Sequence, residues 1–216
     1  MLMQAEREAI VEYGKKLIEE DLTVGTGGNL SIYNPELKYF AISPSGIDYY
    51  ETKPEDVVVM DLNEEIIVGN RKPSSEFHMH TLIYQEKPEA RAIVHCHSTF
   101  ATALAMTRQD LPAASYLIAE AGGNDIKCSR YENYGTMELA EAVLEVLKDR
   151  KACLIANHGQ LSYGDSLESA FSLAKSVEWM CKCYLFSKLA GESKIISPDK
   201  IKETLESFKS YGQDKN

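Results

Sequence analysis

The sequence predicts a single α/β domain in which a central, mostly antiparallel or mixed sheet is flanked by helices on both faces. Short apolar runs bounded by Gly, Pro, Asn or Asp recur along the 216 residues, as expected for strands. Longer segments with apolar residues at helical spacing lie between them. No repeat, low-complexity linker or boundary interrupts this order, so we expect one domain over residues 1–216.

The first part of the chain is rich in strand signals. Residues 1–20 have apolar side chains at helical spacing, and this helix is expected to end near the glycine-rich run 25–28. Four short strands are expected to follow, over 30–33, 39–42, 57–62 and 65–68.

The remainder alternates helices and strands. Pro73, a serine cap and the early acid Glu76 predict a helix that begins there and runs to about residue 85. Thr136 is expected to cap another helix. The other predicted elements are a strand over 92–97, a short helix over 98–106, strands over 152–156 and 160–163, and helices over 167–189 and 199–208. We expect the polar tail from about residue 209 to be mobile.

Composition excludes several classes of partner. The formal net charge of −10 disfavours nucleic acid and anionic membranes, and an anionic substrate would need a local cradle. The first residues show no basic segment leading into an apolar one, so we expect a cytoplasmic protein. Five cysteines without C-x-x-C spacing argue against a disulfide framework or a zinc ribbon.

Three of the five histidines suggest a metal site. His95 and His97 end an apolar run, and on a strand they point to one side while Cys96 points to the other. His158 follows a second apolar run. If the two strand ends lie together, three imidazoles can surround one metal ion and leave a position open for chemistry. The same pair also fits an ordinary hydrogen-bonded strand face.

Small residues form three loops that can cradle a phosphate. They are residues 25–29, 43–46 and 73–75, and each offers backbone N–H groups with short hydroxyl or amide donors. Each loop also fits an ordinary turn, and none has the spacing of a Walker or dinucleotide motif. Glu76 follows the third loop, where a base would lie beside a bound phosphate, although first-turn glutamates are also common. His78 and His80 lie two apart on the predicted helix and diverge, so we interpret them as structural or supporting residues.

Taken in order, these motifs resemble the class II (zinc-dependent) aldolase and adducin-like family over nearly the whole chain. One motif alone is weak, but the set is specific. The matching elements are Gly25-Thr26-Gly27-Gly28-Asn29-Leu30-Ser31, Pro44-Ser45-Gly46, Pro73-Ser74-Ser75-Glu76, Val94-His95-Cys96-His97, Ala121-Gly122-Gly123-Asn124, Tyr134-Gly135-Thr136 and His158-Gly159, with Phe208-Lys209-Ser210-Tyr211-Gly212 near the end.

The resemblance implies a metal and a phosphate site. His95, His97 and His158 would bind one Zn²⁺ per chain, with Glu76 as fourth ligand at rest and as catalytic base once substrate displaces it. The residues implied in phosphate binding are Thr26, Gly28, Asn29, Ser45, Gly46, Ser74 and Ser75.

The resemblance also implies the activity and the assembly. The expected reaction is reversible cleavage of L-fuculose 1-phosphate, or a related ketose 1-phosphate, to dihydroxyacetone phosphate and L-lactaldehyde. The family forms a homotetramer with active sites at subunit interfaces. Tyr116 would act in the neighbouring subunit's site, and Tyr211 would act from the C-terminal tail. Tyr134 occupies an aldehyde-side position where the family has another aromatic residue.

Other functions of the same scaffold stay open. Methylthioribulose-1-phosphate dehydratase and ribulose-phosphate 4-epimerase share the histidine triad, although the epimerases carry aspartate at the position of Glu76. A non-catalytic interaction module like the adducin head is the alternative outside enzymes. The intact triad with Glu76 argues against it.

Overall fold

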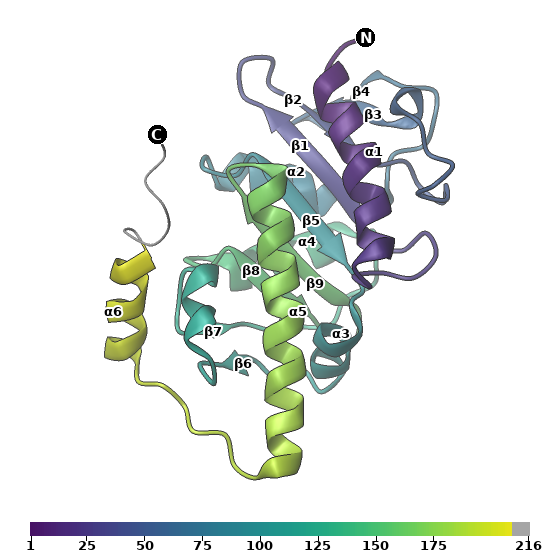
Figure 1. The fold of residues 1–216 in the computed structure, drawn as a ribbon. Coiled ribbons are helices and arrows are strands. Elements are labelled where there is room, and N and C mark those ends of the chain that lie inside the picture. Colours follow the sequence, from purple (N-terminus) through teal and green to yellow (C-terminus); the bar gives the residue numbers. More distant parts are fainter. Residues whose placement is uncertain (209–216) are drawn as a thin grey trace, which may run out of the picture.

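A computed structural model describes residues 1–208 and shows a seven-stranded sheet with helices on both faces (Figure 1). The strand order is β4-β3-β2-β1-β5-β9-β8, and each neighbouring pair is antiparallel. The strands of this sheet are β1 (Asn29–Asn34), β2 (Tyr39–Ile42), β3 (Val58–Asp61), β4 (Ile66–Val68), β5 (Ala92–Cys96), β8 (Ala152–Ile155) and β9 (Gly159–Gly164). The predicted fold class is confirmed, in its antiparallel form.

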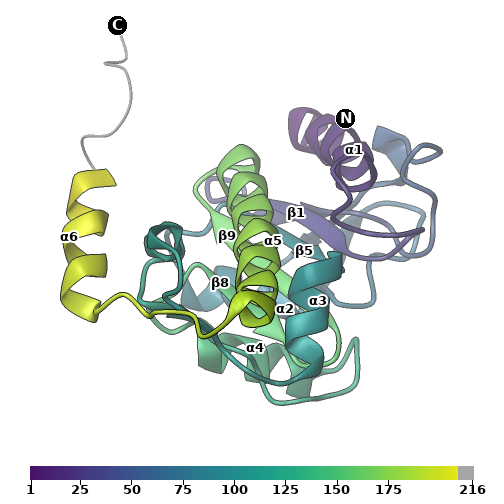
Figure 2. The same cartoon turned by 60° about the horizontal axis from the view of Figure 1, so that its bottom comes forward.

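The helices divide between the two faces of the sheet (Figures 1 and 2). Helices α1 (Gln4–Glu19), α3 (Thr99–Met106) and α5 (Leu167–Ala190) cover one face, and α2 (Phe77–Glu86) and α4 (Met137–Leu147) cover the other. Strand β5 lies inside the sheet between β1 and β9, and its side chains alternate between the two faces: Ile93 packs in the core with α2 and α4, whereas Val94 and Cys96 pack in the core with α1 and α5. Both faces of this strand are therefore buried.

One edge of the fold carries a small sheet and a 3₁₀ turn that the sequence analysis did not predict, beside the predicted helix over 199–208. Strands β6 (Leu111–Pro112) and β7 (Asp125–Ile126) form a small separate sheet, and η2 (Tyr116–Ala121) connects them. The last described helix, α6 (Pro198–Phe208), packs beside η2. The short turn η1 (Pro54–Asp56) was also not predicted.

The helix predicted to begin at Pro73 begins later, at Phe77, and the serine-cap prediction is wrong. Residues before Phe77 are tied to another loop, because the backbone N–H of Ser74 donates to the carbonyl oxygen of Ser43 at 3.0 Å. Glu76 occupies the N-cap position instead and makes no side-chain capping bond. At α4 the prediction is confirmed, since Thr136 Oγ1 accepts a hydrogen bond from the N–H of Leu139 at 3.2 Å.

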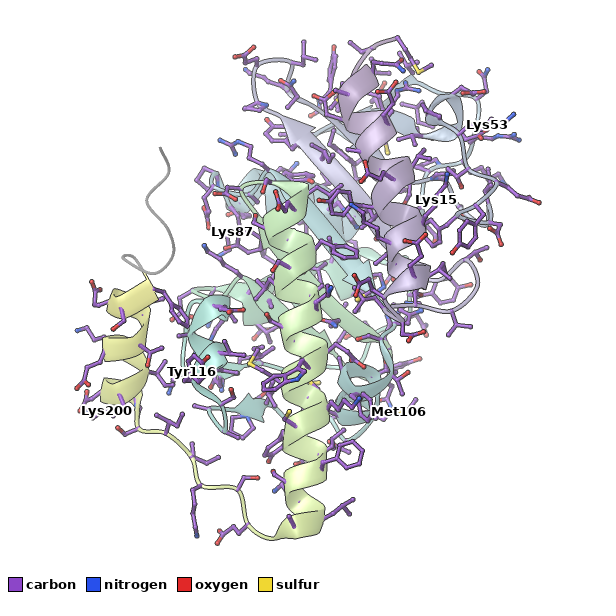
Figure 3. The ribbon with its side chains drawn as sticks, viewed as in Figure 1. Lys15, Lys53, Lys87, Met106, Tyr116 and Lys200 are labelled. Atoms are coloured by element: carbon purple, nitrogen blue, oxygen red, sulfur yellow. The ribbon has the colours of Figure 1, made fainter. Side chains whose placement is uncertain are left out.

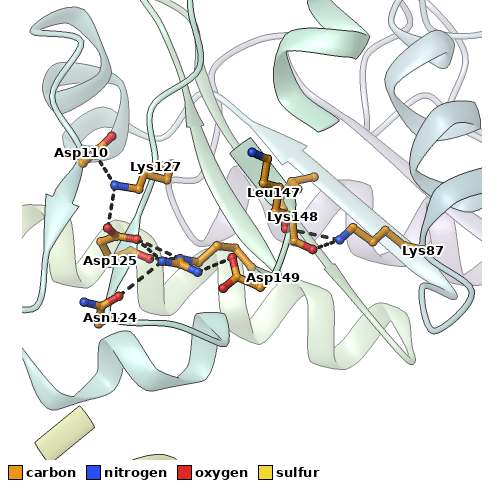
Figure 4. Close-up of polar contacts among 9 residues, drawn as sticks. Lys87, Asp110, Asn124, Asp125, Lys127, Leu147, Lys148 and Asp149 are labelled. Carbon is orange, nitrogen blue, oxygen red and sulfur yellow. Dashed lines mark hydrogen bonds and ion pairs between the residues drawn. The ribbon is translucent and has the colours of Figure 1, made fainter. Parts of the chain in front are cut away.

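A group of charged side chains fixes the β7 edge to the loop between α4 and β8 (Figure 4). Arg150 Nη2 donates to Asp125 Oδ1 at 2.6 Å, and Lys127 Nζ lies 2.9 Å from Asp110 and 2.8 Å from Asp125. A Cβ atom on Gly123 would lie 2.4 Å from the Arg150 guanidinium carbon, so a side chain there would displace the guanidinium group. The Gly122-Gly123 motif thus makes room for an ion pair at the end of η2.

Within residues 1–208, none of the helices has the length and apolar character needed to span a bilayer. The assignment of residues 1–216 to one domain stays a prediction. The tail from about residue 209 lies outside the described residues.

Candidate active site

The three histidines of the predicted metal site come from two neighbouring strands. Strands β5 and β9 run antiparallel, with Cys96 opposite Gln160. His97 directly follows β5 and His158 directly precedes β9, so this register places them side by side at one end of the sheet. The centroids of the three imidazole rings, His95 included, lie 4.8 to 4.9 Å apart.

Two glycines leave room for the ring of His97. A Cβ atom on Gly27 would lie 2.8 Å from His97 Nδ1. One on Gly159 would lie 2.4 Å from the carbonyl oxygen of Cys96 and 3.1 Å from His97 Cδ2. Any side chain at either position would displace the ring or the strand, so these glycines are part of the site.

Hydrogen bonding orients His95. Its Nδ1 lies 2.8 Å from the backbone carbonyl oxygen of Gln160, which can only accept, so Nδ1 carries a proton. His95 Nε2 consequently faces the site, 3.1 Å from His97 Nε2 and 3.0 Å from Glu76 Oε2. The ligand atoms of Glu76, His95, His97 and His158 all lie within 4.8 Å of one another.

Burial and charge set the protonation of this group. Burial, reinforced by His95, lowers the pKa of His97 to about 3 and that of His158 to about 4. Burial opposes charge on His95 too, but Glu76 outweighs it and the pKa of His95 is raised. Burial alone would raise the pKa of Glu76, yet His95, His158 and the amide of Asn29 hold it well below its usual range. The ionised Glu76 carboxylate and the neutral imidazoles of His97 and His158 are in the state that metals bind, whereas a metal would have to displace a proton from His95.

Glu76 completes the group from the loop before α2. Its Oε2 accepts a hydrogen bond from Asn29 Nδ2 at 3.1 Å. Its Oε1 is buried, lies 3.5 Å from His158 Nε2 and has no hydrogen-bond partner among the described residues. Leaving a buried acceptor unpaired costs about 1 to 3 kcal/mol or more for a charged group, and a cation between these side chains would pair it. The residues therefore fit a divalent metal ion.

The small-residue loops are fastened to one another beside this group. The N–H of Ser45 donates to the carbonyl oxygen of Lys72 at 3.0 Å, next to the bond between Ser74 and Ser43. Ser43 Oγ in turn accepts from the N–H of Leu30 at 3.1 Å, at the start of β1. Loops 43–46 and 73–75 thus run side by side against the strand that follows the glycine-rich loop.

Tyr49 holds the glycine-rich loop, and the sequence analysis missed it. Its hydroxyl donates to the carbonyl oxygens of Gly27 at 3.1 Å and Gly28 at 2.9 Å. Its ring packs so closely on α1 that a Cβ atom on Gly14 would lie 2.5 Å from it. A tyrosine in a short turn gives no sequence signal for this role, which depends on the distant helix.

The three small-residue loops and three side chains of the metal group line one cavity of about 340 Å³. Glu76, His97 and His158 lie in its lining. The lining also includes every residue predicted to bind phosphate: Thr26, Gly28, Asn29, Ser45, Gly46, Ser74 and Ser75. Within the described part of the chain, lysine and arginine are absent from the lining, so an anion would meet hydroxyl, amide and backbone N–H donors.

The cavity has two unlike walls. We call the buried side the inner wall: Asn29 and Glu76 line the cavity there, and the buried His95 lies against Glu76. We call the side formed by the loop before α4 the outer wall, consisting of Tyr131, Glu132 and Tyr134. Tyr131 is 49% and Tyr134 72% exposed, whereas Glu76 is 6% exposed.

Tyr116, another predicted site residue, is not part of the cavity lining. Tyr116 is 55% exposed on η2, and its ring centroid lies 6.3 Å from that of Phe208 (Figure 3). Tyr211 lies outside the described residues. The roles predicted for both stay predictions. Cys96 packs on the opposite face of the sheet from the metal group, as predicted.

A family model described as the class II aldolase and adducin N-terminal domain matches residues 8–185. The chain belongs to the class II aldolase family. Members of this family depend on a metal ion, in agreement with the Glu76 and histidine group. The chain is an aldolase, so the adducin-like interaction module is not supported.

Individual relatives of this aldolase cover nearly its whole length. It is 48% identical to a 5-deoxy-D-ribulose 1-phosphate aldolase of Bacillus thuringiensis, over 99% of this chain and 100% of that protein. It is 37% identical to a 5-methylthioribulose-1-phosphate/5-deoxyribulose-1-phosphate aldolase of Rhodospirillum rubrum, over 95% and 92% of the two chains. A solved L-fuculose 1-phosphate aldolase is 43% identical and superimposes with a TM-score of 0.93 over 95% of this chain and 96% of that chain.

Proposed function

We propose that this aldolase uses zinc to cleave a ketose 1-phosphate reversibly into dihydroxyacetone phosphate and a short aldehyde. The observation that carries the proposal is one cavity of about 340 Å³ lined by both the metal group and three loops of neutral donors. In dihydroxyacetone phosphate the phosphate and the ketone are close neighbours on a three-carbon chain. One small molecule can therefore contact both parts of the cavity at once.

His95, His97 and His158 are the proposed ligands of one zinc ion per chain, with Glu76 as an exchangeable fourth. Three imidazoles plus one replaceable position are typical of catalytic zinc sites. When bound, zinc supplies Lewis acidity that stabilises negative charge on the ketone and hydroxyl oxygens of the substrate.

The proposed phosphate site consists of backbone groups and short side chains, which lose little conformational entropy when they bind. Ser45, Ser74 and Ser75 offer hydroxyl and backbone N–H groups, and the N-terminus of α2 adds a favourable dipole for an anion. Thr26, Gly28, Asn29 and Gly46 complete the proposed set.

Glu76 is the proposed proton-transfer base. In the condensation direction its carboxylate removes a proton from the hydroxymethyl carbon of dihydroxyacetone phosphate, and in the cleavage direction it returns that proton. Tyr116 of a neighbouring subunit in a homotetramer is the proposed donor to the aldehyde oxygen, with Tyr211 assisting from the tail. Tyr116 is exposed and is not among the described residues that line the cavity of its own chain, which supports this assignment.

The named substrates of the relatives suggest which aldehyde this aldolase releases. We propose 5-deoxyribulose 1-phosphate as the first substrate, which would give dihydroxyacetone phosphate and acetaldehyde; the 48% identical relative supports it. L-fuculose 1-phosphate, which would give L-lactaldehyde, is the second, supported by the 43% identical structure. Methylthioribulose 1-phosphate enters as an aldolase substrate through the Rhodospirillum rubrum relative, rather than as a substrate for dehydration.

The deciding experiment incubates the purified, zinc-loaded protein with each of these three ketose phosphates in turn. We expect release of dihydroxyacetone phosphate, with kcat/KM largest for 5-deoxyribulose 1-phosphate. A metal chelator should abolish release, and added zinc should restore it.

Two results would overturn the proposal. Dehydrated or epimerised sugar phosphate without a three-carbon product would assign the site to the dehydratase or epimerase reaction. Cleavage that persists in a preparation with no bound divalent metal would remove the metal group from the mechanism.

A further inference from the structure

A string of buried polar side chains leads away from the inner wall into the core between the sheet and α2. Asn29 Oδ1 lies 2.6 Å from His80 Nε2, and His80 Nδ1 lies 2.6 Å from Ser31 Oγ. Ser31 Oγ lies 2.6 Å from the hydroxyl of Tyr84. All four residues are buried, and the proposed mechanism uses neither His80, Ser31 nor Tyr84.

The Glu76 carboxylate at one end of this string fixes which atom donates in each of its hydrogen bonds. Ionised Glu76 only accepts, so Asn29 must turn its Nδ2 toward it, at 3.1 Å, and its Oδ1 toward His80. His80 must then carry its proton on Nε2. Its bare Nδ1 accepts from the hydroxyl of Ser31, and Ser31 Oγ accepts from the hydroxyl of Tyr84.

The alternative arrangement carries a clear penalty. A proton on His80 Nδ1 would leave Nε2 bare and favour a flip of the Asn29 amide, which would bring Oδ1 against the carboxylate of Glu76. Two acceptors would then face each other in a buried site. Because His80 is fully buried, its pKa falls to about 3, and the neutral ring has one proton to place.

We propose that His80, held in its Nε2–H form by Ser31 and Tyr84, is a positioning residue that fixes the Asn29 amide and through it the Glu76 carboxylate. With Oε2 bound by Asn29, Oε1 is the carboxylate oxygen left free for proton transfer. The second N–H of Asn29 stays available to the cavity. This inference rests on the proposed aldolase function, since it assumes that Glu76 moves the proton.

The test measures hydrogen exchange at the hydroxymethyl carbon of dihydroxyacetone phosphate in D₂O, a half-reaction that needs no aldehyde. In His80→Met, which removes the N–H donor, we expect the saturating exchange rate to fall about 10- to 100-fold. Effects of this size are typical of residues that orient a reactive group without touching the substrate. Zinc content per chain and the half-saturating substrate concentration should change little. His80→Gln, which keeps an N–H donor near the same position, should recover part of the rate.

Further variants separate positioning from packing. Ser31→Ala and Tyr84→Phe remove only hydroxyl groups, and the exchange rate should fall more in the first than in the second. The matched control is His78→Gln on the same helix, because His78 Nδ1 bonds Glu64 at 2.7 Å outside this string; its exchange rate should equal that of the unmodified chain. If His80→Met does not fold, Ser31→Ala decides the question.

A second readout needs no turnover. NMR of protein labelled with ¹⁵N-histidine reports which ring nitrogen of His80 carries the proton, and we expect Nε2. A proton on Nδ1 overturns the proposal, as does unimpaired exchange in folded, zinc-loaded His80→Met. Absence of exchange in the unmodified, zinc-loaded chain instead removes the proposed function, while the NMR result still tests the direction of the hydrogen bonds.

Discussion

The inner and outer walls of the cavity are built in opposite ways. On the inner wall, Asn29, Glu76 and His95 are buried and held by hydrogen bonds to neighbouring strands and to α2. On the outer wall, Tyr131 and Tyr134 stand largely exposed on a loop. Groups that move protons need fixed positions, whereas loops tolerate change. We therefore propose that the inner wall carries the bond chemistry and that the outer wall selects the aldehyde.

Among changes to the inner wall, replacing the proposed base Glu76 should reduce proton exchange the most. Glu76→Gln keeps the shape of the side chain but removes its ability to accept a proton, so exchange on dihydroxyacetone phosphate should fall about 10²- to 10⁴-fold. Binding of inorganic phosphate, measured by titration calorimetry, should persist. Glu64→Gln is the control outside the cavity, and exchange at the normal rate in Glu76→Gln would remove Glu76 as the base.

The protonation of the histidines in the metal group should also determine how zinc affinity depends on pH. His97 and His158, with pKa values of about 3 and about 4, are already neutral at pH 5, while the raised pKa of His95 keeps a proton there that zinc must displace. Affinity should therefore fall about tenfold per pH unit as the pH falls from about 6.5 to about 5. Competition with a chromophoric chelator measures this slope. A hundredfold loss per unit would show that more than one proton competes.

Changes to the outer wall should act on the aldehyde alone. Tyr134→Ala removes an exposed aromatic surface from the cavity, and we expect kcat/KM for condensation with acetaldehyde to change about tenfold, equivalent to about 1.4 kcal/mol. Hydrogen exchange on dihydroxyacetone phosphate, measured without aldehyde, should stay within about twofold. An equal loss of hydrogen exchange in Tyr134→Ala would contradict the proposed division of roles between the two walls.

The smallest effect is expected at Cys96, on the far side of the same strand. Cys96→Ala should retain one zinc per chain, because the thiol packs with α1 and α5. The small cavity left behind should cost about 1 kcal/mol and lower Tm by about 2 to 4 °C. Metal analysis together with thermal unfolding checks both parts, and loss of zinc would place the thiol in the metal site.

Local patterns predicted much of the fold and of the site's composition. The spacing of His95 and His97 on a strand requires them to share a face, and the structure places them together with His158. The three loops were visible as small-residue runs, and all of them line the cavity. These features depend on periodicity and residue type, which a sequence displays directly.

Features that depend on tertiary neighbours were not predicted. His80 was interpreted, together with His78, as a structural or supporting residue, but its partners were not predicted; its bonds depend on Ser31, which reaches it from another element of the fold. Tyr49 and Arg150 gain their roles from Gly14 and Asp125, distant in sequence. The start of α2 was misplaced because a serine before a helix resembles a cap until its backbone is seen bonded elsewhere.

The pairing of β5 with β9 also has a consequence for folding. His95 and Gln160 are 65 residues apart in the chain, and the imidazoles meet only after this long loop has closed. Strands β5 and β9 must therefore pair before one metal ion can contact all of its ligands. A bound zinc ion would add stability by mass action, about 2.7 kcal/mol at a free concentration 100 times its Kd. The metal would therefore stabilise the β5–β9 pairing that brings its ligands together.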